Sequence, residues 1–377
     1  MQEIKIIKVK TRAERKLFVE FPLKLYKDCP QFVPPLYSDE MVIFTDKNAY
    51  ADTCRSEFFL AMRGGEVVGR IQGIIQTQHN ELHNERRVRF TRFDAIDDIA
   101  VAKALFAALE GWAGEEGMDT VCGPLGYSDL EREGLLIEGF EYLSTFEEQY
   151  NYEYYAALIE GCGYSKEVDW LEFMLRAPEN PNPMLAKVAA RALELNKLHV
   201  VDHTKYSKRA YIDRYKDRVF DCIDRCYSHL YGTVPFTESM KKQLVDQFMA
   251  ILNKKYLIII ADEEDNPVAF ALCFPSFGEA LKKSGGRLTI PAFFRMFSMI
   301  NKPKVIDLGL IAILPEYQAS GLTAVMLNAM MEFLKSGEID HFETNLNLES
   351  NTAVISQWKY FDATQHKRRR SYIKKLN

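Results

Sequence analysis

The chain has 377 residues, a length that favours two globular domains. Hydrophobic residues make up 47% of it and charged residues 27%, a composition typical of folded proteins rather than disordered ones. The formal net charge of −5 argues against a general nucleic-acid-binding protein, because such proteins are usually basic.

The N-terminal stretch MQEIKIIKVKTRAERK lacks the apolar core of a signal peptide. No apolar run in the chain approaches the ~20 residues that a membrane-spanning helix needs. These two features predict a cytoplasmic protein. The cysteines are scattered and odd in number, unlike a disulfide framework. Cys222 and Cys226 share a helix face, but no second pair lies nearby in the sequence, so no metal site is expected.

The first half of the chain reads as strands alternating with helices. Residues 58–62 and 67–71 have the apolar pattern of two strands, joined by a polar turn. Further strands are expected at 87–93, at 120–123 and from Tyr164, and helices at 99–115 and 152–160.

A cluster of prolines follows the first half, at Pro178, Pro181 and Pro183. Prolines at this density continue neither a helix nor a central strand, so we interpret the stretch as a linker. We place a domain boundary near residue 180, which gives domains 1–180 and 181–377.

The second half repeats the order of the first at a spacing of about 200 residues, which indicates a duplicated domain rather than a solenoid. Because strands alternate with helices in both halves, the predicted fold class is α/β, with two tandem domains that each have a mixed central sheet flanked by helices. The expected elements of this half are strands at 256–260, 267–271, 305–313, 341–346 and 365–372, and helices at 322–334 and 351–358.

The loop after the strand 305–313 has the sequence LPEYQASGLT and opens the next helix. A strand, a short glycine-containing loop and a helix N-terminus form a cradle for anions, because the loop amides and the helix dipole point at the ligand. The loop resembles the acyl-CoA-binding loop of the GCN5-related N-acetyltransferase superfamily, Gln/Arg-x-x-Gly-x-Gly/Ala. Gln318 and Gly321 fit this pattern, while Thr323 stands where glycine or alanine is usual.

This resemblance implies acetyltransferase-like domains and a substrate that is acetyl-CoA or a longer acyl-CoA. It implies that the strand 307–314 receives the pantetheine arm and that the following loop amides hold the pyrophosphate. The residues expected to contact the acyl-CoA are Ile313, Leu314, Gln318, Ala319, Ser320, Gly321, Leu322, Thr323, Asn351 and Trp358.

Three stretches of the first half resemble, more specifically, a bacterial family of tandem acetyltransferase-fold proteins. They are GPLGYS at 123–128, EGLLIEGF at 133–140 and YNYEYY at 150–155, and the resemblance covers most of the chain. Some members of that family are linked to N-acylation of long-chain sphingoid bases. The resemblance therefore implies an acyl-CoA-dependent N-acyltransferase acting on a primary amine.

The first half has no counterpart of the glycine-containing loop. Its sequence at 93–98, FDAIDD, carries three carboxylates and no glycine, so a pyrophosphate would be repelled there. We predict that the first domain is degenerate and does not bind CoA, and that each chain has one active site, in the second domain.

Polar residues fall at every second position from Glu343 to Asn351, and in an extended segment all five would point to one side. One interpretation is a solvent-facing strand that ends in a helix cap at Ser350 or Asn351. The other is a row that lines the cleft where the thioester meets the amine, with a carboxylate as the general base. The row consists of Glu343, Asn345, Asn347, Glu349 and Asn351.

The catalytic candidates come from this row and from the strand before the loop. Glu343 and Glu349 are candidates for the base, and Asn347 is a candidate for orienting the reacting groups. Asp307 is a third candidate base, because many members of the superfamily carry a carboxylate on this strand; a charge in solvent is its alternative interpretation. Trp358 stands where the superfamily often has a tyrosine that protonates the leaving thiolate, and an indole cannot act as that acid.

An insertion between the strands 267–271 and 305–313 is rich in phenylalanine and methionine and carries basic residues such as Lys282 and Arg295. Its flexible and aromatic side chains suit an acyl tunnel, and its basic residues suit contact with a membrane surface. The alternative is a helix packed on its own core.

Two other functions stay open. A non-catalytic acyl-CoA-binding protein fits the departures at Thr323 and Trp358. An aminoacyl-tRNA-dependent transferase fits the tandem fold, although the acidic net charge and the CoA-type loop argue against it.

Overall fold

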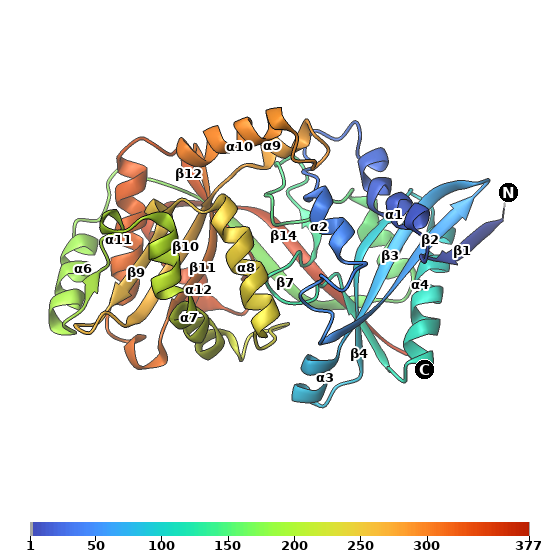
Figure 1. Cartoon of the computed structure of the whole chain (residues 1–377), viewed down its shortest axis with the longest axis horizontal. Helices are drawn as coiled ribbons and strands as arrows, with labels where there is room; N and C mark the ends of the chain where they lie inside the picture. The colour runs from blue at the N-terminus through green and yellow to red at the C-terminus, as the bar shows by residue number, and fades with distance from the viewer. Residues whose placement is uncertain (1–2, 377) are drawn as a thin grey trace. The chain divides into compact units, whose positions relative to one another are not determined.

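The computed structural model describes residues 3–376, which form two compact units (Figure 1). In each unit helices flank a sheet with parallel and antiparallel strand pairs, so the predicted α/β fold class is confirmed. Among the helices within 3–376, none is long and apolar enough to cross a membrane. The first unit consists of Met1–Leu171, Gly278–Phe293 and His366–Asn377, and the second of Glu172–Phe277 and Phe294–Gln365.

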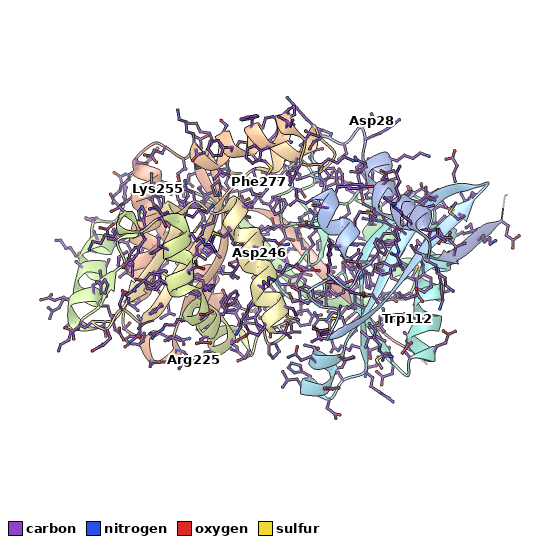
Figure 2. The ribbon with its side chains drawn as sticks, viewed as in Figure 1. Asp28, Trp112, Arg225, Asp246, Lys255 and Phe277 are labelled. Atoms are coloured by element: carbon purple, nitrogen blue, oxygen red, sulfur yellow. The ribbon has the colours of Figure 1, made fainter. Side chains whose placement is uncertain are left out.

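The first unit is built mainly from the first half of the chain. Its strands are β1 (Ile4–Lys8), β2 (Cys54–Arg63), β3 (Glu66–Gln76), β4 (Arg87–Ala95), β5 (Thr120–Gly123), β6 (Leu135–Glu138) and most of β14 (Asp362–Lys375), and its helices are α1 (Arg12–Leu25), α2 (Tyr37–Val42), α3 (Thr77–His83), α4 (Ile99–Glu115), α5 (Tyr154–Gly161) and α9 (Gly278–Lys282). The strand order is β1-β2-β3-β4-β5-β14. Trp112 of α4 packs in the core of this unit (Figure 2).

The second unit has a sheet of strand order β7-β12-β11-β10-β9-β8, in which β11 and β12 are parallel. Its strands are β7 (Ser165–Arg176, from Glu172 on), β8 (His199–Val200), β9 (Leu257–Ala261), β10 (Pro267–Pro275), β11 (Val305–Ile313), β12 (His341–Thr344) and β13 (Asn347–Leu348). Its helices are α6 (Met184–Leu195), α7 (Lys208–Tyr227), α8 (Glu238–Ile251), α11 (Leu322–Lys335) and α12 (Thr352–Ile355), and α10 (Ile290–Asn301) crosses the division between the units.

The last strand of each half belongs to the sheet of the other unit. Leu175 of β7 pairs with Phe342 of β12 in the second unit, and Tyr372 of β14 pairs with Gly123 of β5 in the first. The two units are therefore not separated at a single position near residue 180, because the chain passes between them more than once. The segment Gly278–Phe293 also belongs to the first unit, where Arg287 Nη2 lies 2.8 Å from Glu20 Oε1. The assignment of separate roles to domains 1–180 and 181–377 stays a prediction.

Helices cover both faces of the second sheet. Successive residues of a strand point to opposite faces. On β10, Cys273 belongs to the core formed with α11, whereas the ring of Phe274 stacks on Phe248 of α8 at 5.1 Å between centroids. It follows that α11 and α8 lie on opposite faces, and α6 packs alongside α11 (Figure 1).

A buried ion-pair network stabilises the first unit. Arg92 sits at a β-bulge of β4 with a φ of 47°, and the bulge directs its guanidinium to Glu40, which accepts at 2.9–3.1 Å. Arg70 contacts both Glu40, at 3.9 Å, and Asp94, at 2.7 Å. Burial alone would raise the pKa of Glu40, but Arg92 and Arg70 lower this pKa to about 2.

We expect the first unit to lose stability in acid through Glu40. Because its pKa is lowered by folding, the carboxylate stabilises the fold fully above its unfolded pKa near 4.5, and this contribution is lost as the pH falls toward 2. Glu40→Gln should lower the free energy of unfolding by about 3–5 kcal/mol at pH 7 and flatten its dependence on acid pH. Urea denaturation of both proteins between neutral and acid pH measures this. The control is Glu66→Gln, which breaks an exposed pair with Lys24 and should cost about 1 kcal/mol or less.

Candidate functional site

The strands β11 and β12 part in the middle of the second sheet. They pair in parallel from Val305 opposite His341 to Leu308 opposite Thr344, where β12 ends. β11 continues to Ile313 and keeps its pairing with β10. All of its residues after Leu308 except Ala312 are only partly buried. Beyond Leu308 the edge of β11 that faced β12 is therefore no longer paired with that strand, and we call it the open edge in this sense.

A β-bulge in β11 begins at the point of parting. Leu272 of β10 lies opposite Leu310 and Cys273 lies opposite Leu308, so Gly309 is the extra residue. A Cβ at Gly309 would lie 2.6 Å from the ring of Phe274. Only glycine fits there, and the bulge turns the rest of β11 away from its parallel partner.

The end of α7 contacts this open edge. Leu314 donates its amide to Val268 of β10, so the alternate residues Ile311 and Ile313 turn their N–H and C=O groups away from β10. Tyr227 Oη donates to the carbonyl of Ile311 at 2.8 Å and accepts from its amide at 3.2 Å. The thiol of Cys226 contacts the carbonyl of Ile313 at 3.2 Å. Two side chains of α7 thus occupy the backbone edge predicted to receive the pantetheine arm.

The loop that follows β11 is the stretch predicted to form an anion cradle. A short 3₁₀ turn, Pro315–Tyr317, leads to Gly321, which has a φ of 83° and directly precedes α11. The amides of the first helical turn, at Leu322 and Thr323, point out of the helix end. The other predicted pyrophosphate contacts lie in the same loop, where Gln318 and Ala319 are exposed and Ser320 is half-buried. Outside the loop, Leu314 is buried where β11 ends.

Contacts from neighbouring helices hold this loop. Asn196, which follows α6, donates from Nδ2 to the carbonyl of Ser320 at 3.3 Å. A Cβ at Gly321 would lie 3.3 Å from the Cβ of Ala192 on α6. On the other side, Arg225 of α7, labelled in Figure 2, pairs with Glu316 at 2.9 Å. The loop is therefore held by Asn196 on one side and by Arg225 on the other.

Two of the predicted catalytic carboxylates lie side by side. Asp307 of β11 is the register partner of Glu343 on β12, so both point to the same face of the sheet. Ile306 and Phe342 belong to the core with α11, which places the two carboxylates on the opposite face. Asp307 is 6% exposed.

His341 joins this pair and was missed from the sequence. Its Nε2 lies 3.7 Å from Glu343 Oε1. The signal in the sequence is the spacing of two residues on one strand, which puts His341 and Glu343 on the same face. A carboxylate pair beside an imidazole is able to accept a proton and pass it on.

The predicted row of five polar residues on one strand is wrong, because the strand breaks after Thr344. Thr344 Oγ1 accepts from the amide of Phe173 on β7 at 2.8 Å and from Nδ2 of Asn347 at 2.9 Å. Asn347 also donates to the carbonyl of Asn345 at 2.7 Å. These bonds close a turn between β12 and β13, and they give Asn347 a structural role.

The remaining predicted residues of the row lie beyond this turn. Glu349 is partly buried in the turn after β13, and Asn351 caps α12 by accepting from the amide of Val354 at 3.3 Å. This is the helix cap of the first interpretation. Trp358 is 5% exposed and belongs to the same hydrophobic core as Leu327 of α11. Contacts of Asn351 and Trp358 with an acyl-CoA stay predictions.

Within residues 3–376, no group of three or more His, Cys, Asp or Glu side chains is arranged to hold a metal ion. Cys222 and Cys226 contact backbone carbonyls instead, of Pro267 and Ile313.

Comparison with solved structures identifies the fold as that of tandem GCN5-related N-acetyltransferase proteins. The structure matches a tandem GNAT protein from the clavulanic acid biosynthesis pathway with a TM-score of 0.57, at 12% identity over 100% of this chain and 99% of that one. It matches a GCN5-related N-acetyltransferase from Sphaerobacter thermophilus with a TM-score of 0.50, at 9% identity over 99% and 95% of the two chains. The predicted fold is confirmed.

Two relatives in sequence align with nearly the whole chain. The chain is 28% identical to Protein YghO of Escherichia coli (strain K12), over 96% of this chain and 93% of that one. It is 26% identical to the Bacterial ceramide synthase of Caulobacter vibrioides (strain NA1000 / CB15N), over 99% and 98% of the two chains. The sequence matches none of the protein families against which it was compared. The structural match to a tandem GNAT protein and the relative named as a ceramide synthase together bear out the predicted resemblance.

Proposed function

We propose that the protein transfers an acyl group from acyl-CoA to a primary amine, at the site in the second unit. The observation that carries this proposal is the open edge of β11, which leads through the turn at Gly321 into α11. A strand edge suits the amides of a pantetheine arm, and the helix N-terminus beside it suits a pyrophosphate.

The chemistry follows from the carboxylates beside the parted strands. The amine nitrogen attacks the thioester carbonyl, a carboxylate accepts the amine proton, and CoA leaves as its thiolate. Asp307 and Glu343 are the proposed bases, because their register puts them next to each other on β11 and β12. His341, 3.7 Å from Glu343, is proposed to position that carboxylate or to relay its proton.

The corresponding place in the first unit is filled, which supports one site per chain. The bulge of β4 carries Arg92, whose guanidinium pairs with Glu40, where the bulge of β11 carries Gly309. At the end of β4, Ala95 donates its amide to Tyr155 Oη at 3.1 Å and accepts from Tyr154 Oη at 2.7 Å. Tyrosine hydroxyls also bond the backbone of β11, so the distinguishing feature of the first unit is the buried Arg92–Glu40 pair, which could not make way for a ligand without leaving charges unpaired. We infer that no pantetheine arm binds there.

We propose a long-chain sphingoid base as the amine and a long-chain acyl-CoA as the donor. The support is the alignment over nearly the whole chain with a relative named as a ceramide synthase. Transfer of a fatty acyl group to a sphingoid amine gives a ceramide-type amide and free CoA.

Calorimetric titration with acetyl-CoA and with palmitoyl-CoA, followed by a thiol-release assay with sphinganine, tests both parts. Preference for palmitoyl-CoA and release of one thiol per amide formed is the expected result. Tight binding without turnover of any amine would instead identify a non-catalytic acyl-CoA-binding protein. Lack of binding to either thioester would contradict the proposal altogether.

Tyr227→Phe is expected to tighten acyl-CoA binding about three- to tenfold, because the tyrosine hydroxyl occupies the amide and carbonyl of Ile311 that a pantetheine arm would use. The dissociation constant for palmitoyl-CoA measures this. Tyr215→Phe is the matched control, since Tyr215 also lies on α7 but bonds Asp265. Weaker binding by Tyr227→Phe would mean that the hydroxyl contacts the ligand rather than covering its place.

A further inference from the structure

The helix α10 has an apolar face that is exposed to solvent. Its residues Ile290, Phe293, Phe294 and Phe297 recur at intervals of three and four, so they share one face of the helix. On the other side, Ala292 and Met296 are buried. The exposed fractions are 58% for Leu288, 76% for Ile290, 57% for Phe293, 65% for Phe294 and 58% for Phe297.

The exposed apolar side chains of this face form a group on one helix rather than isolated residues. Isolated exposed apolar side chains are normal on a protein surface, but a contiguous group marks a binding surface. Of the large hydrophobic side chains that are exposed within residues 3–376, all the phenylalanines lie on α10. Neither a helix packed on its own core nor an enclosed acyl tunnel accounts for aromatic rings that are more than half exposed.

The segment around α10 is rich in basic residues, two of which are paired with carboxylates, Lys282 with Glu279 at 3.8 Å and Arg287 with Glu20 at 2.8 Å. Residues 280–306 contain six lysines and arginines and no aspartate or glutamate, in a chain whose formal net charge is −5. Exposed lysines lie before and after the helix, at Lys283, Lys302 and Lys304. Apolar and aromatic side chains flanked by basic ones form the pattern of a helix that lies in the interface of an anionic membrane.

We propose that α10 docks this protein on the surface of a bilayer that contains anionic lipid. With 12 residues the helix is about 18 Å long, too short to span a hydrocarbon core of about 30 Å, so it lies along the surface. Its phenylalanines enter the boundary between head groups and acyl chains, while the lysines face the phosphates. A second copy of the chain is a poorer occupant, because a symmetric contact would bring two copies of the basic segment together.

This inference goes beyond the proposed function and does not depend on it. It also does not need any contact outside the segment 280–306, since the apolar face, its buried opposite side and the flanking lysines all lie there.

Flotation with vesicles tests the proposal on the full chain. One set of vesicles is phosphatidylcholine, and the other contains about one third phosphatidylglycerol. The unaltered protein should float with the anionic set, and the triple variant Phe293→Ser, Phe294→Ser, Phe297→Ser should partition at least about tenfold less. The control is Leu82→Ser with Leu195→Ser, which removes side chains that are 61% and 63% exposed on other helices and should change partitioning less than about twofold.

A second measurement gives a signal from the helix itself. Phe294→Trp should shift its fluorescence to the blue on addition of anionic vesicles, and Lys283→Glu with Lys302→Glu and Lys304→Glu should reduce that shift most at low salt. The proposal is overturned if the unaltered protein does not bind anionic vesicles, or if the triple serine variant floats with them as well as the unaltered protein does. Concentration-dependent dimers that the serine variant loses, without vesicle binding, would identify the face as a contact between copies.

Discussion

Glu343→Gln and Asp307→Asn are each expected to lower kcat by about 10²–10⁴-fold if the carboxylate that they replace is the general base, while the dissociation constant for acyl-CoA stays within about twofold. Both substitutions keep size and hydrogen bonding but remove the ability to accept a proton at neutral pH. The two side chains are register partners across β11 and β12, so their effects should be far from additive in the double variant. Steady-state kinetics with sphinganine and palmitoyl-CoA, beside calorimetry with palmitoyl-CoA, measures the two quantities separately.

Glu349→Gln is the matched control for these variants. It makes the same chemical change in the turn after β13, outside the strand pair that holds Asp307 and Glu343. We expect it to retain kcat within about threefold. A large loss in Glu349→Gln with little change in the other two would move the base to that turn. Loss of acyl-CoA binding in Glu343→Gln would mean that this carboxylate supports the acyl-CoA-binding loop rather than accepting the amine proton.

Elements with strong local signals could be predicted from the sequence. The helix Ile99–Glu115 and the strands Thr120–Gly123 and Val305–Ile313 have the predicted bounds. The helix begins directly after Asp98, whose side chain caps it by accepting from the amide of Ala100. Such signals lie within a few residues of the element that they define.

The exchange of last strands between the sheets could not be predicted. Each of β7 and β14 is the last strand of its half, and an alternating pattern does not specify which strand pairs with which. The early end of β12 also depends on a contact between residues that are distant in the sequence. Thr344 stops the strand by accepting from Phe173, which lies on β7 and far away in the sequence.

The same distinction applies to the candidate site: features that are adjacent in the sequence could be predicted, and contacts between distant elements could not. Gly321 and its loop were found because a strand, a glycine and a helix start follow one another in sequence. Tyr227 was missed because its role depends on where α7 ends relative to β11, which the sequence does not state. Asp307 and Glu343 were proposed separately, and the register of β11 and β12 makes them neighbours.

Gly321→Asp is expected to weaken acyl-CoA binding by at least about 30-fold relative to Gly321→Asn. The two side chains have the same shape, and both tolerate the positive φ of 83° better than other residues do. Either one meets the Cβ of Ala192 on α6 at about the same distance, so any loss of stability should be common to both. The aspartate alone adds a negative charge where the pyrophosphate is proposed to lie against the helix N-terminus. The ratio of their dissociation constants for CoA, measured by calorimetry, therefore isolates the charge.

Salt dependence makes the test sharper. Repulsion between the new carboxylate and a pyrophosphate should weaken as ionic strength rises, so the ratio between the two variants should shrink in high salt. A steric effect through Ala192 would be the same at every salt concentration. Equal dissociation constants for both variants at low salt would show that the pyrophosphate lies elsewhere, and the loop at Gly321 would then be a structural turn between β11 and α11. A ratio that is large and falls with salt would fix the position of the anion without any change to the carboxylates proposed as the general base.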